Sequence, residues 1–157
     1  MLAEVLADRL SHDPPASDAS FDRLFPRAYL DPTEEDSALE WESSVRPDLA
    51  REKAGSLTLL AACLRSASPE GATEQPVVAR IGPDEVDAWL MALNDLRLDL
   101  GTRLGVDEER DPTTAAPADP DADWWSVYDF LTWCQGMLVE VILGDSDTAD
   151  GTGDERT

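Results

Sequence analysis

Cys63 and Cys134 are the residues of this sequence whose side chains could react, because a thiol can be oxidised or can form a disulfide. A disulfide between them needs Cα atoms within about 7 Å of each other, and the sequence offers no closely spaced cysteine pair. Both lie in apolar stretches, where a free cysteine behaves as a small hydrophobic residue. We therefore predict two core thiols, and a redox pair is the alternative.

The other titratable residues show no pattern typical of an enzyme. A metal or acid–base site needs several converging ligands, yet His12 is the only histidine and lies in a proline-rich loop. A glycine-rich phosphate loop, a nucleophile elbow and clustered Cys/His spacing are also missing from the sequence. We predict a protein that is not an enzyme, with no cofactor, no metal site and no catalytic role for His12.

Four charged residues within 82–105 are candidates for binding or for structure. Asp95 and Asp99 lie one helical turn apart, and we predict that they pair with Arg103 and other nearby cations on a polar face. Arg97 lies between two leucines. If it is buried it must pair with a carboxylate, because an unpaired buried guanidinium is too costly. We favour a structural role for Arg97 over ligand recognition.

The charge of the chain argues against unaided binding to nucleic acid. Asp and Glu total 34 and Lys and Arg total 12, which gives a formal net charge of −22, and such a field repels a phosphate backbone. The N-terminal third has a relative excess of basic residues. We predict that they pair mainly with nearby acids instead of forming a phosphate site: Arg23, Arg27, Arg46, Arg51 and Lys53.

A central helix over residues 83–104 positions the charged candidates. Pro83 suits the first helical position, the acids after it favour the positive end of the helix dipole, and Gly105 suits the left-handed residue that ends a helix. Apolar residues recur at steps of three and four: Val86, Trp89, Leu90, Leu93, Leu96, Leu100 and Leu104. This pattern predicts a core helix.

The whole pattern predicts an all-α protein, a compact bundle of about four to five helices. Further helices are expected over 2–10, 47–66 and 124–143, with short helical turns within 21–30 and after Asp31. Residues 76–81 alternate weakly and predict at most one short strand without an evident partner. We expect a single domain over 1–144 that includes an acidic linker loop at 107–123, and a disordered acidic tail at 145–157.

The helix expected from Trp124 to Leu143 is apolar around most of its circumference. A membrane span is rejected, because Asp129, Gln135 and Glu140 interrupt the run and no Lys or Arg flanks it. An ordinary surface helix turns about a third of its circumference to the core. We therefore predict that this helix is either the centre of the bundle or covered by a second copy in a homodimer.

Four stretches resemble an actinobacterial domain-of-unknown-function family labelled AosR-like, after an oxidative-stress transcriptional regulator. They are RLFPRAY at 23–29, the helix start at 48–53, WLMALNDLRLDLGTRLG at 89–105 and VYDFLTWCQGMLV at 127–139. The candidates for partner binding or structure on these motifs are Arg23, Arg27, Asn94, Asp95, Arg97 and Arg103.

The resemblance implies a cytoplasmic, mostly helical, non-enzymatic protein with redox-linked control of transcription through a protein partner such as a sigma factor. In this hypothesis oxidation of Cys63 or Cys134 is the input, and the acidic surface suits a basic patch on the partner. The alternative is an adaptor or structural module associated with Clp proteolysis or cysteine biosynthesis, without redox sensing. The family also implies a basic, β-containing segment before the first helix, which we expect to be absent because Met1 falls within that helix.

Overall fold

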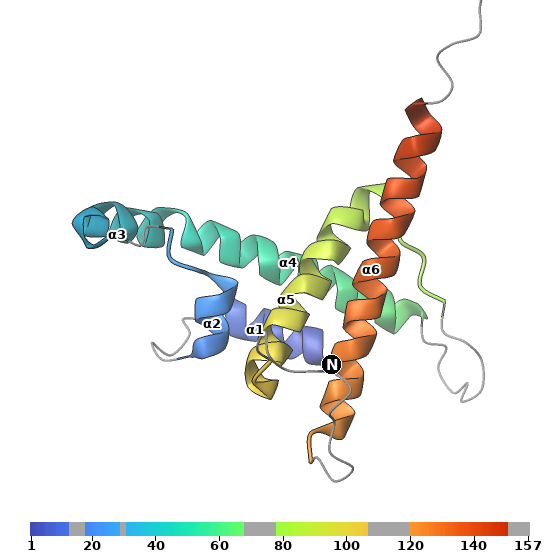
Figure 1. Ribbon diagram of the computed structural model, residues 1–157, viewed down its shortest axis with the longest axis horizontal. Coiled ribbons are helices and arrows are strands. Elements are labelled where there is room, and N and C mark those ends of the chain that lie inside the picture. Colours follow the sequence, from blue (N-terminus) through green and yellow to red (C-terminus); the bar gives the residue numbers. More distant parts are fainter. Residues whose placement is uncertain (13–17, 29–30, 68–77, 107–119, 151–157) are drawn as a thin grey trace, which may run out of the picture.

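The computed structural model describes residues 1–12, 18–28, 31–67, 78–106 and 120–150. Within them the chain forms six α-helices, two one-turn 3₁₀ helices and no strand, which confirms the all-α prediction (Figure 1). The elements are α1 (Leu2–Ser11), α2 (Ala19–Leu24), η1 (Pro32–Glu34), α3 (Glu35–Ser44), α4 (Arg46–Ala67), η2 (Pro83–Glu85), α5 (Val86–Leu104) and α6 (Ala122–Asp150).

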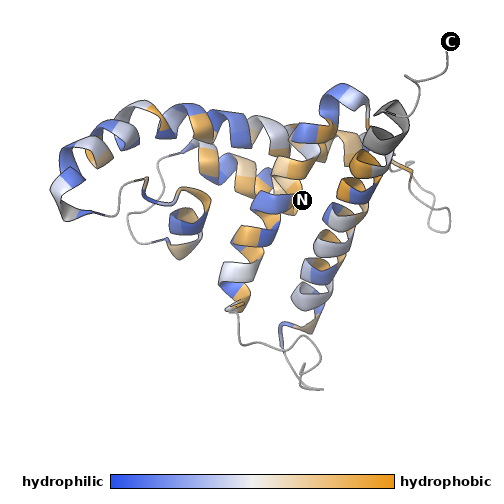
Figure 2. Ribbon diagram, turned by 45° about the horizontal axis from the view of Figure 1, so that its top comes forward, coloured by the Kyte–Doolittle hydropathy of each residue, from blue (hydrophilic) through white to orange (hydrophobic). Residues whose placement is uncertain are grey.

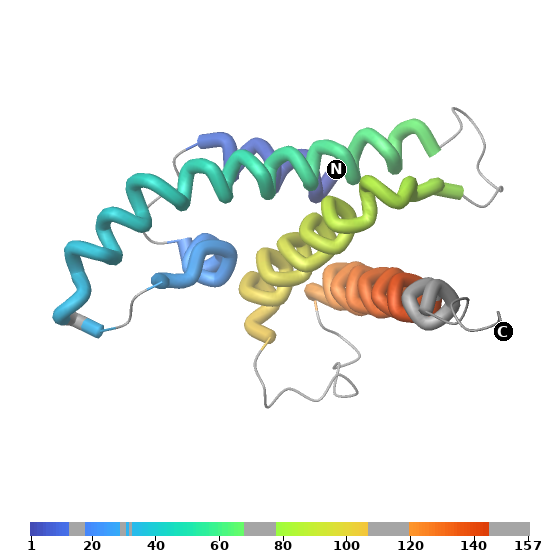
Figure 3. The backbone as a smooth tube through the Cα atoms, turned by 90° about the horizontal axis from the view of Figure 1, so that it is seen from above, coloured from blue at the N-terminus to red at the C-terminus, as the bar shows by residue number. Residues whose placement is uncertain are grey.

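Helix α5 lies in the middle of the assembly, between α4 and α6 (Figure 3). Helix α1 runs alongside α4, α2 packs against α5, and α3 extends from the start of α4, far from α6 (Figures 1 and 3). The most deeply buried apolar residues come from α1, α4 and α5, and they include Leu6, Leu57, Leu60, Ala61, Ala92 and Leu96. These three helices contribute most of the core, and α2 adds Phe21 and Leu24 to the same cluster.

The predicted ends of the central helix are largely confirmed. Pro83 opens the one-turn helix η2, which leads directly into α5, and Glu85 Oε2 accepts a hydrogen bond of 2.9 Å from the Gly82 N–H. Gly105 adopts the left-handed conformation with φ of 66°, which is the conformation that closes a helix at no cost for a residue without Cβ. The stretch that organises the fold was thus visible in the sequence.

The structure changes two expectations for the last helix. Of the two alternatives for its apolar circumference, the centre of the bundle is excluded, because among the described elements α6 packs against α5 alone and lies at the edge (Figure 3). Cover by a second copy stays a prediction. It also continues through Gly144 to Asp150, past the predicted end at Leu143, so residues 145–150 of the expected tail are helical. The rest of that tail, 151–157, lies outside the part of the chain that the structure describes. A single glycine in a long helix costs only about 1 kcal/mol relative to alanine, which is too little to stop this one.

Other sequence-based expectations fall partly beyond the part of the chain that the structure describes. Of the weak strand at 76–81, residues 76 and 77 lie outside it, and 78–81 form no strand. Of the acidic linker at 107–123, residues 107–119 lie outside it, whereas 122 and 123 already belong to α6. In the described helices, none has an apolar run sufficient to cross a membrane.

Candidate protein-interaction surface

Helix α6 rests on α5 along one narrow stripe. Leu131 is buried, and Tyr128, Cys134 and Leu138 are half-buried against the core. The two helices approach closely at Gly101, where an added Cβ would lie 3.1 Å from Cε2 of Tyr128. A residue without a side chain at this position lets the Tyr128 ring settle onto α5, which fixes the rotation of α6 about its own axis.

Arg97 links α5 to α6 through polar contacts. Its Nε donates to Thr132 Oγ1 at 3.0 Å and its Nη1 donates to Gln135 Oε1, while the guanidinium carbon lies 5.6 Å from the centre of the Tyr128 ring. The side chain is half-buried, so it does not need the carboxylate that full burial would have required. The structural role that we favoured for Arg97 stays a prediction. These contacts indicate which substitution tests it.

We expect Arg97→Ala to lower the free energy of unfolding by about 1–2 kcal/mol, because it removes two hydrogen bonds from a charged group and a cation–π contact. Urea unfolding measures the loss, and faster hydrogen exchange in α6 would locate it. Arg27→Ala is the matched control, since among the described residues Arg27 has one polar contact, an exposed ion pair with Glu35, worth about 1 kcal/mol at most. Equal losses in the two variants would contradict a linking role for Arg97.

Beside the stripe that contacts α5, helix α6 carries a second stripe of exposed apolar side chains. We call this stripe the outer face; its residues recur at steps of three and four and are Val127, Phe130, Trp133, Met137 and Val141. Phe130, Trp133 and Val141 are about 60% exposed. Figure 2 shows apolar residues along α6, which stands at the edge of the helical assembly. Monomeric proteins rarely expose a contiguous stripe of large apolar side chains, and such a stripe usually marks a site of interaction with a partner.

Two aromatic rings form the middle of the outer face. The rings of Phe130 and Trp133 stack with centroids 6.0 Å apart and planes 27° apart. Large aromatic side chains dominate binding energy at protein interfaces, particularly when they are already ordered before binding. The outer face therefore has the composition of a docking surface.

One border of the outer face is acidic. Asp129 precedes Trp133 by one helical turn, and Glu140 follows Met137 by three residues, so both carboxylates lie along the same flank of the helix. Both are exposed, and among the described residues neither forms an ion pair. The whole of α6 contains six acidic residues and no Lys or Arg.

The two cysteines do not meet. Cys63 lies on α4 and Cys134 on α6, and within the described chain no Cα of α4 lies within 8 Å of a Cα of α6. A disulfide needs a shorter separation, so the intramolecular redox pair that the sequence left open is not compatible with this arrangement. Both thiols are free and half-buried against the core, and burial raises the pKa of Cys134, which lowers its fraction of reactive thiolate.

Asp95 and Asp99 are buried, and this corrects their predicted place on a polar face. Asp95 is 0% exposed and accepts a hydrogen bond of 2.7 Å from Nζ of Lys53, 42 residues away on α4. Its second oxygen, Oδ2, has no hydrogen-bond partner among the described residues. Burial raises the pKa of Asp95, and the hydrogen bond and charge of Lys53 offset only part of that rise.

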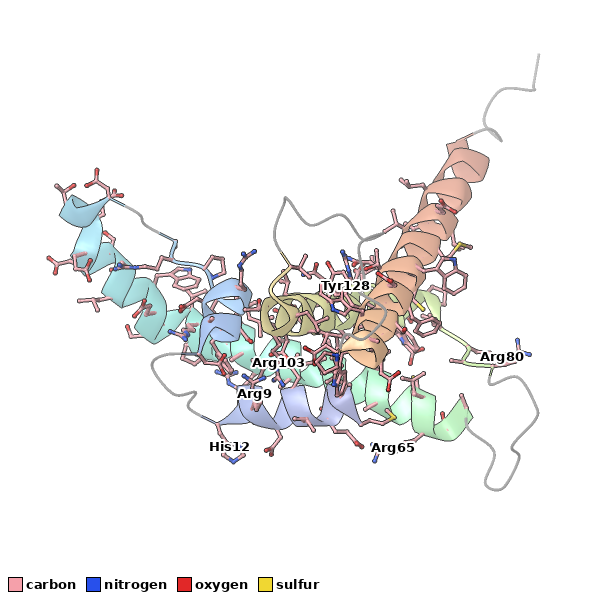
Figure 4. The ribbon with its side chains drawn as sticks, turned by 60° about the horizontal axis from the view of Figure 1, so that its bottom comes forward. Arg9, His12, Arg65, Arg80, Arg103 and Tyr128 are labelled. Atoms are coloured by element: carbon pink, nitrogen blue, oxygen red, sulfur yellow. The ribbon has the colours of Figure 1, made fainter. Side chains whose placement is uncertain are left out.

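Asp99 joins three parts of the chain. Its carboxylate is 1% exposed and forms two ion pairs. Nη1 of Arg9, on α1, lies 2.7 Å from Oδ1, and Nη2 of Arg103 lies 3.1 Å from Oδ2. Arg9 also binds Asp18, the residue that caps α2. In Figure 4, Arg9 and Arg103 lie close together between α1 and α5. The predicted pairing of Asp99 with Arg103 is confirmed.

Sequence reasoning missed Arg9. The available signal was its position, because Arg9 follows Leu6 by three residues and Leu2 by seven, so it shares the apolar face of α1. A cation on such a face needs a buried acid across the interface. Nothing in the local sequence indicates that this acid is 90 residues away.

The remaining basic candidates have mixed surroundings. Arg27 pairs with Glu35 at 3.0 Å and Arg51 pairs with Asp48, as we predicted for this group. Arg46 instead lies over the Phe25 ring at 5.3 Å. Two candidates have no polar partner in the part of the chain that the structure describes: the exposed Arg23 and the half-buried Asn94.

An open cleft of about 1000 Å³ lies among α1, α2, α3 and α4. Its walls mix apolar side chains such as Phe21 and Leu39 with charges of both signs, including Asp22 and Arg46. His12 lies on its rim, is exposed, and places Nδ1 2.8 Å from the carbonyl oxygen of Asp8. Within the described residues, no three His, Cys, Asp or Glu side chains come together as a metal site.

Comparison with known proteins places the sequence in a family. The model of the domain of unknown function DUF2017 matches residues 1–142. The chain belongs to the DUF2017 family. The resemblance seen on the sequence motifs is confirmed at this level, since the relatives of this DUF2017 chain include proteins named "Oxidative stress regulator AosR" from Mycobacterium bovis and Mycobacterium tuberculosis.

The sequence identity to these relatives is low but extends over most of the chain. Each is 27% identical to the DUF2017 chain over 150 residues, which is 91% of this chain. The chain spans 66% of the length of each relative. No solved structure matches the chain.

Proposed function

We propose that this DUF2017 chain is a non-enzymatic regulatory protein that acts by binding another protein through the outer face of α6. The observation that carries this proposal is the stripe of five exposed apolar residues with a stacked Phe130–Trp133 pair at its middle. The name of the mycobacterial relatives, oxidative stress regulator, supports a regulatory role. The partner that the family resemblance favours belongs to the transcription machinery, such as a sigma factor, with the protein acting in the cytoplasm.

The redox part of this proposal rests on single thiols. Cys134 lies four residues after Phe130 and three before Met137, so it borders the outer face on the side toward α5. Oxidation of this half-buried thiol would place a polar group beside the docking surface and weaken apolar contact there. A disulfide between Cys63 and Cys134 is no part of this proposal, because the helices that carry them have no Cα atoms within 8 Å of each other.

A second candidate function follows from the same cysteines. The raised pKa of Cys134 reduces its reactivity toward peroxide, which favours an adaptor or structural module without redox sensing. Such a protein, in Clp proteolysis or cysteine biosynthesis, would use the same outer face. The two functions differ in the identity of the partner and in the response to oxidant.

We expect the double variant Phe130→Ser/Trp133→Ser to lose a bound cellular partner at least tenfold. The immobilised protein is incubated with lysate of the source cells and bound proteins are quantified by mass spectrometry. The matched control is Leu39→Ser/Val45→Ser, because these two apolar side chains are also exposed (55% and 44%) but lie around α3, far from α6. Both double variants keep the net charge.

The outcome separates the alternatives. Recovery of a transcription factor that falls after peroxide treatment, and no longer falls in Cys134→Ser, supports the redox-linked regulator. Recovery of a component of Clp proteolysis or cysteine biosynthesis, unchanged by peroxide, supports the adaptor. A set of bound proteins that is the same for wild type and for Phe130→Ser/Trp133→Ser would contradict both functions.

A further inference from the structure

We propose that the occupant of the outer face is an amphipathic helix whose apolar residues are bordered by Lys or Arg. This inference rests on the proposed function and specifies the chemistry of the partner. A helix is the element that suits the geometry, because the outer face is itself a straight helical ridge. From Val127 to Val141 it spans about 21 Å at 1.5 Å per residue, which matches a partner helix of about four turns.

The charge around the outer face selects a basic partner. Asp129 and Glu140 border the aromatic pair along one flank, are exposed, and have no ion-pair partner within the described residues. The sequence of α6 adds four more acids and no cation, and the chain as a whole carries −22. Lys or Arg next to the apolar residues of a partner helix would meet these carboxylates, and the long-range field would accelerate its approach.

The same charges disfavour a second copy of this protein. In an antiparallel helix pair, each flank of one helix lies against the same flank of the other. Packing two outer faces about their midpoint between Trp133 and Met137 would therefore place Asp129 of one copy near Glu140 of the other. A parallel pair would align the identical acidic sequences, and either dimer joins two chains of −22. The homodimer that was one of the two alternatives from the sequence is thus the less favourable occupant.

Synthetic peptides test this chemistry directly. The first probe is an 18-residue helical peptide with Leu along one stripe and Lys at the bordering positions. The second has Glu in place of each Lys, and the third has the composition of the first in a non-amphipathic order. Binding is measured by fluorescence anisotropy across a salt series, and NMR shift perturbation maps the contact residues.

We expect the Lys peptide to bind wild type and Leu39→Ser/Val45→Ser equally, and Phe130→Ser/Trp133→Ser at least tenfold more weakly. Asp129→Asn/Glu140→Gln should weaken binding several-fold and reduce its salt dependence. The Glu peptide and the non-amphipathic peptide should bind at least tenfold more weakly than the Lys peptide. All substituted side chains are exposed, and circular dichroism verifies that each variant is folded.

Three results would overturn the inference. Equal binding of the Lys peptide to wild type and Phe130→Ser/Trp133→Ser would show only non-specific attraction to an acidic protein. Equal binding of the Lys and Glu peptides would remove the charge preference. A wild-type dimer in analytical ultracentrifugation that dissociates in Phe130→Ser/Trp133→Ser would make a second copy the occupant. If cellular capture still depends on the outer face in any of these cases, the proposed function stands without the basic helix.

Discussion

Replacing Lys53 with methionine lowers the free energy of unfolding by about 3–5 kcal/mol at neutral pH, the range found when one partner of a buried ion pair is removed. Lys53 Nζ lies 2.7 Å from Asp95 Oδ1, and the side chains are 12% and 0% exposed. Methionine fills a similar volume without charge, so the variant isolates the electrostatic loss. The buried Asp95 then loses the cation that stabilises its ionised form.

The loss should depend on pH in a defined direction. Burial raises the pKa of Asp95 in the folded protein despite the offset by Lys53, so the folded state binds this proton more tightly than the unfolded chain does. The contribution of Asp95 to the free energy of unfolding therefore falls as the pH rises from its ordinary value of 3.8 through the folded pKa. Lys53→Met removes the offset and raises this pKa further. The gap between variant and wild type should thus be larger at neutral pH than at about pH 5.

Urea unfolding at the two pH values measures both effects. Arg51→Met is the control, because Arg51 and Asp48 form an exposed pair (74% and 70% exposed) that contributes about 1 kcal/mol or less. Lys53→Met/Asp95→Leu should recover most of the loss, since two apolar side chains can replace a buried ion pair. A loss below about 1 kcal/mol, or one independent of pH, would mean that Asp95 is better solvated than its contacts indicate.

Asp99→Ala should lower the free energy of unfolding by about 2–4 kcal/mol. The carboxylate is 1% exposed and holds Arg9 at 2.7 Å, and Arg9 in turn holds Asp18 at the start of α2. The expected loss is smaller than that for Lys53→Met, because Arg9 is 25% exposed and retains Asp18 as a partner. The first amides to exchange faster should be those of α1 and α2.

Arg103→Ala provides the comparison for Asp99→Ala. Arg103 contacts the same carboxylate at 3.1 Å but is 47% exposed, so its removal should cost about 1 kcal/mol or less. Urea unfolding and hydrogen exchange of the two variants separate the contributions. Equal losses would show that the connection from α1 to α5 through Arg9 contributes little.

Local signals in the sequence were sufficient to predict where the helices lie. They were insufficient to predict which residues of different helices form ion pairs. Pro83, the apolar repeat and Gly105 specify α5 because helix starts, faces and ends depend on residues within one or two turns. The pairing of Asp95 with Lys53 and of Asp99 with Arg9 joins residues 42 and 90 apart. No local pattern encodes such a contact, and so the two acids were assigned to a polar face.

The position of α5 explains this error and the error for α6 together. Helix α5 has neighbours on opposite sides, with α1, α2 and α4 on one and α6 on the other, so the side that reads as polar is buried and needs cations from other helices. Helix α6 is the more apolar of the two in sequence, which suggested the central place. With that place taken by α5, α6 lies at the edge and its apolar residues form the outer face. The sequence indicated that the apolar residues of α6 need a packing partner. It did not indicate which of them α5 leaves exposed.

The central claim is that the outer face of α6 binds the protein partner, and hydrogen exchange of the protein alone and in complex with the captured partner tests it most directly. We expect the amides over 127–141 to exchange more slowly in the complex, while those lining the cleft among α1, α2, α3 and α4 keep their rates. Slower exchange around the cleft with unchanged exchange in 127–141 would contradict the claim.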